Sequence, residues 1–508
     1  MTGANGQAPT GAFGAASRAC FEQVLAWLEG NESATLSHGE LEDQLECRGR
    51  ELLRRLLQDH LSLRATTEER LTVVTDDAGV VHASVEAGHC RVLATVFGQV
   101  NVQRLAYRHR HDHGHRNLHP ADGLLNLPVE RHSHGLRRLA AIESSRGSFE
   151  QAAAAITRAT GQQVGKRQVE ALAARAAADV EDFYATRTHN EPAEDDVLII
   201  SADGKGIVMR PDALRAATAK AAAAATTRLA TRLSKGEKRG RKRMAEVGAV
   251  YDLTPVPRCP ADVLASDKHE HDPDPPPVPD AKNKWVTASV VDDAAAVIAT
   301  IFDQAERRDP SHARTWVALV DGNNHQIERI HAEASTRGIT VTVLIDLIHV
   351  LEYLWGAAWC FFPEADPGAE AWVRQRALAI LDGHARGVAA GIRRRATASK
   401  LPASKRRKAD QCAAYLVNKA GYLHYPGALA AGWPIATGII EGACRYLVAD
   451  RMDITGARWS VDGAEAVLKL RAVRANGDFD AYWRYHLDRE RQRVHESCYA
   501  NGVIPLAA

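Results

Sequence analysis

Short apolar runs alternate with helical patterns between residues 196 and 350, and this alternation restricts the possible folds more than any other feature. The runs of strand character are VLIISADGKG, AEVGAVYDL, KWVTASVVDD, TWVALVDG and TVTVLIDL. Helical patterns lie among them at DAAAVIATIFDQAERR and from about 324 to 337. Such alternation predicts an α/β domain with a central, partly parallel sheet.

The rest of the chain divides around this core. Leucines at helical spacing from 17 to about 65 predict an amphipathic helix, and alternating polar and apolar residues from 71 to 108 predict short antiparallel strands. From about 350 to 432 the pattern is helical. We therefore expect five regions: an N-terminal helical and β region (1–128), a helical region (129–190), the first part of the core (196–350), a helical insertion (351–435), and the last part of the core with C-terminal helices (436–508).

Composition narrows the class of protein. A chain of 508 residues, 45% hydrophobic and 25% charged, is typical of a soluble globular protein with more than one core. The eight cysteines include no C-x-x-C pair, which favours a reducing cytoplasm over a disulfide framework or a thiolate zinc site. No secretory signal is visible, and the most apolar window contains Asp346, His349 and Glu352, so no membrane span is expected.

Three acids stand where metal ligands would be useful. Asp203 and Asp321 each come where an apolar run gives way to glycine, and Glu441 lies on a later helix rich in arginine and glycine. Carboxylates that meet at one edge of a sheet suit Mg²⁺ or Mn²⁺ and phosphodiester chemistry. The alternative is structural: aspartate before glycine is common in turns, and Glu441 could simply pair with Arg445.

The segment SFEQAAAAITRATGQQVGKRQVEALAARAA has the outline of a helix-turn-helix. Ser148 and Glu150 open one helix, Gly161 ends it, and Lys166 and Arg167 begin a second helix that could enter a DNA groove. An ordinary helical hairpin explains the same pattern.

A histidine cluster follows Tyr107, and it is compatible with either a metal site or a solvated loop. Its members are His109, His111, His113, His115 and His119.

The net charge of +1 gives little support for a nucleic-acid partner, so local basic patches must carry that prediction. Two runs, Arg228 to Arg243 and Arg393 to Lys408, each hold about eight Lys or Arg, enough for phosphate contacts. Either run could instead be a solvated face or a loop. The candidate DNA contacts in these runs are Arg239, Arg241, Lys242, Arg243, Arg394, Arg395, Arg406 and Arg407.

Further candidate DNA contacts surround Glu441. They are Arg445, Arg451, Arg458 and Trp459, of which the tryptophan could stack on an unpaired base or pack against the Glu441 helix.

Five ordered blocks carry a resemblance to a known family. SADGKG, ALVDGNNHQI, DLIHVLEYLW, PIATGIIEGACRYL and DRMDITGARWSVDGAEAVLKLRA resemble bacterial insertion-sequence transposases of the ISKra family, over about residue 90 to the C-terminus. That family is similar to the Mutator-like DDE transposases. The resemblance implies a ribonuclease H-like core interrupted by a helical insertion, with Asp203, Asp321 and Glu441 as first, second and third acid.

The resemblance extends to a histidine motif. Asp346 and His349 form an Asp-x-x-His that resembles a signature placed between the second and third acids of Mutator-like enzymes. It implies that His349 steadies the scissile phosphate or a flanking nucleotide, although a buried histidine that caps a helix is an alternative. Asp346 is also the rival for second acid. One departure concerns Tyr107, after which histidines replace the paired cysteines of relatives, so a zinc ribbon is not carried over.

The resemblance implies a DDE transposase that binds terminal inverted repeats, cleaves DNA and joins the 3′-hydroxyl to target DNA with two Mg²⁺ or Mn²⁺ ions. Because two DNA ends must be cut together, a homodimer or larger assembly on DNA is expected. The alternatives are a catalytically inactive DNA-binding regulator and a metal-dependent nuclease without strand transfer.

Overall fold

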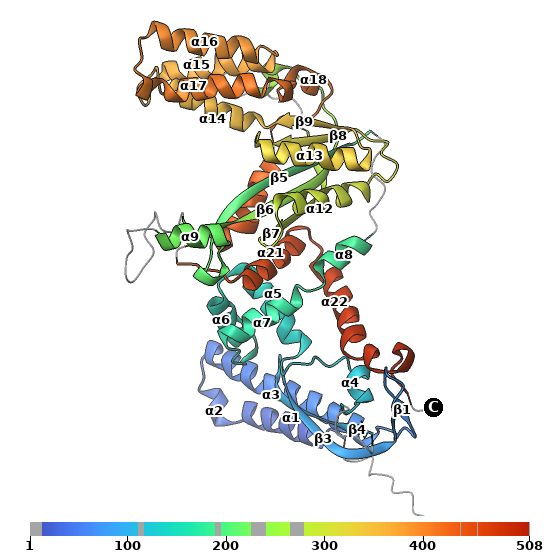
Figure 1. Cartoon of the computed structure of the whole chain (residues 1–508). Helices are drawn as coiled ribbons and strands as arrows, with labels where there is room; N and C mark the ends of the chain where they lie inside the picture. Colours follow the sequence, from blue (N-terminus) through green and yellow to red (C-terminus); the bar gives the residue numbers. More distant parts are fainter. Residues whose placement is uncertain are drawn as a thin grey trace, which may run out of the picture. The chain divides into compact units, whose positions relative to one another are not determined.

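The computed structural model of the chain describes residues 13–109, 116–187, 195–224, 240–264, 279–436, 438–454 and 456–506. They form a mixed α/β protein of two compact units, one made of Met1–Phe183 and Asp478–Ala508, the other of Tyr184–Gly477 (Figure 1). The last helix, α22 (Phe479–Val494), therefore belongs to the first unit, whereas residues 436–508 were expected to stay with the core.

Two long helices and a β-hairpin begin the first unit. A capping box between Ser37 and Glu40 starts the longest helix, and Leu57 and Leu61 on its far half pack on the hairpin. The predicted helix and antiparallel strands are confirmed, and the hairpin strands are longer than expected. The elements are α1 (Ala15–Leu28), α2 (Asn31–Ala34), α3 (His38–Thr66), β1 (Val74–Thr75), β2 (Val81–His82), β3 (Ser84–Thr95) and β4 (Gly98–Arg108).

Three mutually packed helices follow in the same unit. Ser148 and Gln151 form the capping box of the second helix, and Gly161 ends it in the left-handed conformation at φ 69°. The two helices expected on either side of Gly161 are confirmed. The elements are α4 (Pro120–Leu124), α5 (His134–Arg146), α6 (Phe149–Thr160) and α7 (Lys166–Ala176), with α8 (Val180–Thr186) at the junction of the units.

A buried charge network ties α22 to this helix trio. Arg137 on α5 is fully buried and donates to Glu490 Oε2 at 2.6 Å. Arg493 donates to Glu490 Oε1 at 2.7 Å and to Asp179 Oδ1 at 2.9 Å, and His486 contacts Asp179 at 2.6 Å. Because every buried carboxylate here meets a cation, the network holds the C-terminal helix in place.

A five-stranded mixed sheet of order β7-β6-β5-β8-β9 forms the centre of the second unit. β6 is antiparallel to both β5 and β7, while β8 and β9 continue the sheet in parallel with β5. The predicted α/β core with a partly parallel sheet is confirmed. The strands are β5 (Val197–Val208), β6 (Lys242–Leu253), β7 (Ala281–Ser289), β8 (Trp316–Val320) and β9 (Val341–Ile345).

The two helices predicted among the strands are confirmed, and two shorter helices that were not predicted accompany them. Every residue of β8 is buried, as expected for a central strand covered on both faces. On β6, a Cβ at Gly248 would lie 2.7 Å from Ile301, so glycine lets a helix approach the sheet closely. The predicted helices are α12 (Ala294–Glu306) and α13 (Asn324–Arg337), and the two shorter ones are α9 (Ala216–Ala224) and α11 (Pro260–Val263), with a 3₁₀ turn at Pro211–Ala213.

The helical block expected between 351 and 435 is present, and it shares one hydrophobic core with the sheet. Leu354 and Leu416 of the block cluster with Val317 and Leu344 of the strands. Burying each such leucine contributes roughly 1.5–3 kcal/mol. The helices are α14 (Leu347–Ala358), α15 (Pro367–Leu381), α16 (Ala385–Ala398), α17 (Ala403–Asn418) and α18 (Tyr425–Ala430).

Near its end, the second unit contains a helix that changes from α-helical to π-helical geometry and back. α19 (Gly438–Ala443) runs into a π-helical segment, Cys444–Ala449, and then α20 (Asp450–Met452). α21 (Val461–Ala475) packs against β7. Within the described ranges, no helix combines the length and apolar character needed to cross a membrane.

Candidate functional site at the edge of the sheet

Strand register brings the predicted acids to one level of the sheet. Leu198 of β5 pairs with Trp316 of β8, and five residues further along the chain from each lie Asp203, within β5, and Asp321, directly after β8. Val320 pairs with Ile345 of β9, so Asp321 and Asp346 follow side by side. Neighbouring strands lie about 4.8 Å apart. Three aspartates from distant parts of the sequence thus share one edge.

Asp203 lies inside its strand and not at the end of it, although the apolar run gives way to glycine at this position. β5 continues to Val208 because β6 remains paired with it past Gly204 and Gly206, whereas the parallel pairing with β8 stops at Ser201. The Asp203 carboxylate accepts hydrogen bonds from the Gly204 N–H at 2.6 Å and from the Cys444 thiol at 3.2 Å. Asp203 therefore lies two residues after the last residue of β5 that pairs with β8.

Asp321 occupies a tight turn between β8 and α13. Its Oδ1 accepts from the Asn323 N–H at 2.7 Å, and Asn323 in turn caps α13. Gly322 has a φ of +92°, and a Cβ there would lie 2.7 Å from the Tyr415 hydroxyl, which donates to the Asp321 carbonyl at 3.2 Å. Glycine is required in this turn, and α17 of the helical block buttresses it.

One cavity of about 610 Å³ contains both Asp203 and Asp321. Cations line it as well: Arg215 precedes α9, and Lys242 and Arg243 begin β6. Lys242 pairs with Asp453 at 3.0 Å, and Arg243 donates to the Val290 carbonyl at 2.8 Å. Acids and cations around one hollow suit a phosphate bound with metal ions.

The cavity contains residues that sequence reasoning missed. Glu246 of β6 pairs with Gly204 and is half-buried, and its pKa is raised by burial, with Asp203 and Asp293 adding to the shift. Asp293 and His325 also line the cavity. The sequence does show a glutamate on a strand next to the Asp203 strand. Whether its side chain points into the cavity depends on the register between the two strands, which the sequence alone does not reveal.

Glu441 is exposed on α19, which contacts both β5 and β6. Cys444 lies one turn further on and hydrogen-bonds Asp203, so this helix is joined to the first acid. Burial raises the pKa of the Cys444 thiol, and the nearby charges of Asp203 and Glu441 act in the same direction. Arg445 pairs with Asp450 at 3.7 Å and not with Glu441, so the alternative that Glu441 simply pairs with Arg445 is wrong.

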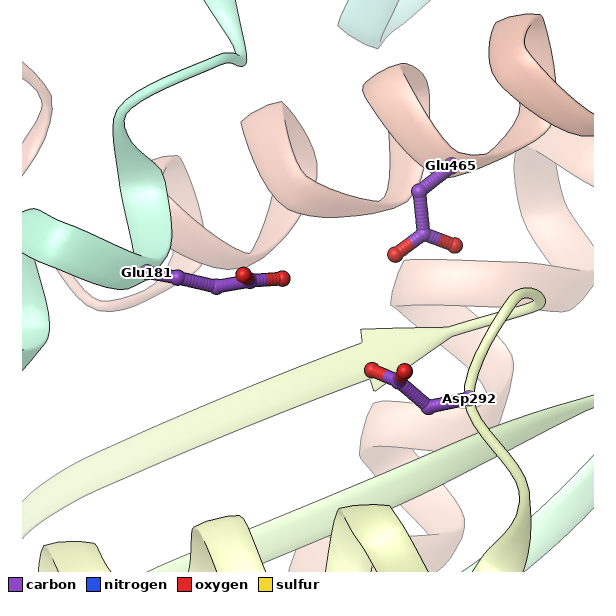
Figure 2. Close-up of side chains that lie close together, drawn as sticks. All are labelled: Glu181, Asp292 and Glu465. Atoms are coloured by element: carbon purple, nitrogen blue, oxygen red, sulfur yellow. The ribbon is translucent and has the colours of Figure 1, made fainter.

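The ligand atoms of Asp203, Asp321 and Glu441 are not all within 4.8 Å of one another. A closer acidic pair in this unit is Glu465 on α21 and Asp292 after β7, within that distance (Figure 2). Such a pair could hold a cation, but Glu465 already accepts from the Ser289 hydroxyl at 2.9 Å and the Val290 N–H at 2.8 Å. It therefore serves to anchor α21. Glu181, also drawn, belongs to the other unit and is not part of this pair.

A second cavity of about 590 Å³ adjoins Asp321 and includes His349 and Lys408. His349 Nδ1 lies 3.4 Å from Glu352. Asp346 is buried and caps α14 by accepting from the Ile348 N–H at 2.7 Å. Of the two rivals for second acid, Asp321 is the one that lines both cavities.

The basic candidates of the two runs differ in exposure and in their contacts. Arg394 and Arg407 are exposed, and Arg241 is half-buried. Arg395 instead lies over the rings of Phe361 and Phe362 at 4.8 and 4.5 Å. Arg406 pairs with Asp410 and Arg239 lies outside the described residues.

Around Glu441, two of the four candidate DNA contacts are buried. The Arg451 guanidinium lies 4.6 Å from the Trp459 ring, and both residues are at most 5% exposed. Trp459 Nε1 donates to the Met452 carbonyl at 3.0 Å. Of the two alternatives for Trp459, stacking on a base or packing inside the protein, the structure shows packing, because the buried ring is not accessible to a base. Arg445 and Arg458 are exposed.

In the first unit, Lys166 and Arg167 are exposed at the start of α7, where they could meet a phosphate. Of the histidine cluster, His109 and His119 hydrogen-bond the carbonyls of Val81 and Leu105, both at 2.9 Å. The other three histidines lie outside the described residues.

Comparison with protein-family models gives no match for this chain, and comparison with curated proteins gives none either. What the chain does is therefore inferred from the geometry of the site together with the sequence blocks.

Proposed function

We propose that this chain is a DDE transposase of the ISKra type, with Asp203, Asp321 and Glu441 as its three acids. The observation that carries the proposal is the cavity in which Asp203 and Asp321, 118 residues apart in sequence, meet the cations Arg215, Lys242 and Arg243. A mixed sheet with a helical block between the second and third acids agrees with the ribonuclease H-like core that the resemblance implies.

The donor atoms present fit Mg²⁺ or Mn²⁺. All three acids offer carboxylate oxygens, which these ions prefer. Asp321 Oδ1 is held by one backbone N–H, and Glu441, among the described residues, forms neither a hydrogen bond nor an ion pair. Two such ions would supply charge to activate a nucleophile and to stabilise the leaving oxygen of a phosphodiester.

The protein side chains have separate tasks in this proposal. Arg215 and Lys242 attract a DNA phosphate into the cavity, since both line it beside the acids. His349 on the other side of Asp321 steadies the scissile phosphate or a flanking nucleotide. The helix trio α5–α7 acts as a helix-turn-helix that holds the terminal repeat, with Lys166 and Arg167 at the groove.

One assay separates the proposal from its alternatives. Purified protein is incubated with a labelled element end, a target plasmid and Mg²⁺, and the products are resolved on a gel. A transposase cleaves the end and joins it to the plasmid. Binding without cleavage would instead indicate a regulator, and cleavage without joined product would indicate a nuclease.

A further inference from the structure

The α1–α3 pair carries a stripe of large apolar side chains that nothing in the described chain covers. Spacings of three, four, seven and eight residues place them along one face of each helix. All are between 36% and 48% exposed: Phe21, Leu25 and Leu28 on α1, and Leu45, Leu53, Leu56 and Leu63 on α3. Single exposed leucines are ordinary, but a contiguous stripe indicates an interaction surface.

The two helices are antiparallel, and their stripes lie on the same side. The Ser17 N–H donates to Asp59 Oδ2 at 3.0 Å, and the Arg48 guanidinium lies 4.2 Å from the Trp27 ring. Each residue turns the helix by about 100°, clockwise when the helix is viewed along its axis from the N-terminus. In that view, the leucine stripe of α3 lies clockwise of the side of α3 that faces α1. The stripe of α1 likewise lies clockwise of the side of α1 that faces α3. In an antiparallel pair, these two directions coincide.

The opposite side of α3 is already in use. Gln58 exchanges hydrogen bonds with the backbone of Asn101 on β4 at 3.0 and 2.8 Å, and Leu61 packs on the hairpin. In Figure 1, α1 lies next to α3, and α3 packs on β4. The apolar stripe is thus the third, outward side of the pair.

Gly49 lies within the stripe, between Leu45 and Leu53, in the middle of the 29-residue α3. A glycine inside a helix destabilises it relative to alanine. No atom lies within 4 Å of the position that a Cβ would take there, so the chain itself does not require glycine. A glycine on an outward face allows a second backbone to approach closely.

We propose that this face is a homodimer interface, in which α3 packs antiparallel against α3 of a second copy. A two-fold axis near residue 54 places Leu45 opposite Leu63 of the second copy, and Leu53 opposite Leu56. The charges beside the stripe agree with this pairing, because Glu42 and Glu46 then lie opposite the segment of the second copy that contains Arg64.

The proposed interface does not depend on the proposed function, because it needs neither DNA nor the acids of the second unit. Sedimentation or light scattering of the full chain without DNA tests it. The wild-type chain is expected at twice its 55.2 kDa mass, and Leu53→Glu/Leu56→Glu at 55.2 kDa. Val129→Glu, at another exposed apolar position (60%) in the same unit, is the matched control and should stay dimeric.

Gly49→Gln provides a second test that misfolding cannot explain. The substitution favours the helix, so thermal stability of the monomer should not fall, while the dimer dissociation constant should rise by about tenfold or more. A dimer unaffected by both variants would overturn the proposal. So would a monomeric wild-type chain, including one that used the face to bind lipid vesicles or a different protein.

Discussion

Acidic side chains are treated in opposite ways in two regions of this molecule. In the first unit, Glu490 and Asp179 are buried and each meets an arginine, Arg137 or Arg493. At the sheet edge of the second unit, the hydrogen bonds that Asp203 and Asp321 accept from described residues come from backbone N–H groups and a thiol. Acids that are paired with cations hold helices together, whereas acids with uncharged donors can offer their oxygens to a bound metal ion.

Whether an acid is paired with arginine depends on its role and not on the unit to which it belongs. Asp252 belongs to the second unit and is as buried as the acids of the first, and it is neutralised by Arg314 at 2.9 Å and Arg308 at 3.4 Å. The sheet therefore contains both kinds of acid. The acids at the cavity, Asp203 and Asp321, differ from Asp252 because their hydrogen-bond donors are uncharged.

The largest expected effect lies at the cavity. Asp321→Asn should reduce DNA cleavage by at least about a thousandfold, roughly 4 kcal/mol in the barrier. Its unfolding free energy should change by less than about 1 kcal/mol, because only one backbone N–H donor is affected. Cleavage rates and urea unfolding measure the two quantities.

Asp346→Asn is the matched variant, because asparagine can also cap α14. It should retain cleavage. If Asp321→Asn stayed active while Asp346→Asn lost activity, the second acid would move to Asp346.

The opposite result is expected in the charge network. Arg137→Met leaves Glu490 with one fewer cation in a buried place and should lower the unfolding free energy by about 3–5 kcal/mol. Its neighbour Arg138, exposed and paired with exposed Asp480, provides the control. Arg138→Met should cost at most about 1 kcal/mol. Equal losses in the two variants would contradict the role of the network.

Acid should weaken the first unit through the same network. Burial raises the pKa of Glu490, but hydrogen bonds from Arg493 and Arg137 outweigh it and lower the pKa to about 2. The folded state thus favours the ionised form. Its contribution is complete above the ordinary glutamate pKa of 4.5 and is lost as pH falls toward 2.

Unfolding free energies measured between pH 6 and 2 test this point. Glu490→Gln should show a shallower loss of stability with falling pH than wild type does. An identical slope in the two proteins would refute the assigned linkage.

The smallest effect concerns the thiol beside Asp203. Cys444→Ala removes the donor to Asp203 Oδ2 and should slow cleavage by up to about tenfold, as one hydrogen bond allows. Cys444→Ser keeps a donor and should recover most of the rate. Equal rates in the two variants would indicate that the thiol only fills space.

Much of the core could be predicted from sequence because its signals are local. The apolar run of β8 and the Asn-capped start of α13 are legible in ALVDGNNHQI. The interior position of Asp203 was not predictable, since it results from the long antiparallel pairing with β6. The burial of Arg451 and Trp459 depends on tertiary packing, and so does the pairing of Arg137 with Glu490, 353 residues away.

Cleavage of element-end DNA by Glu441→Gln tests the central assignment most directly. Glu441 is exposed, so its replacement should leave folding and DNA affinity unchanged. The expected result is normal DNA binding with no cleavage in Mg²⁺, while Asp480→Asn, which removes an exposed acid elsewhere, cleaves as wild type does. Cleavage by Glu441→Gln at the wild-type rate would contradict the three-acid site.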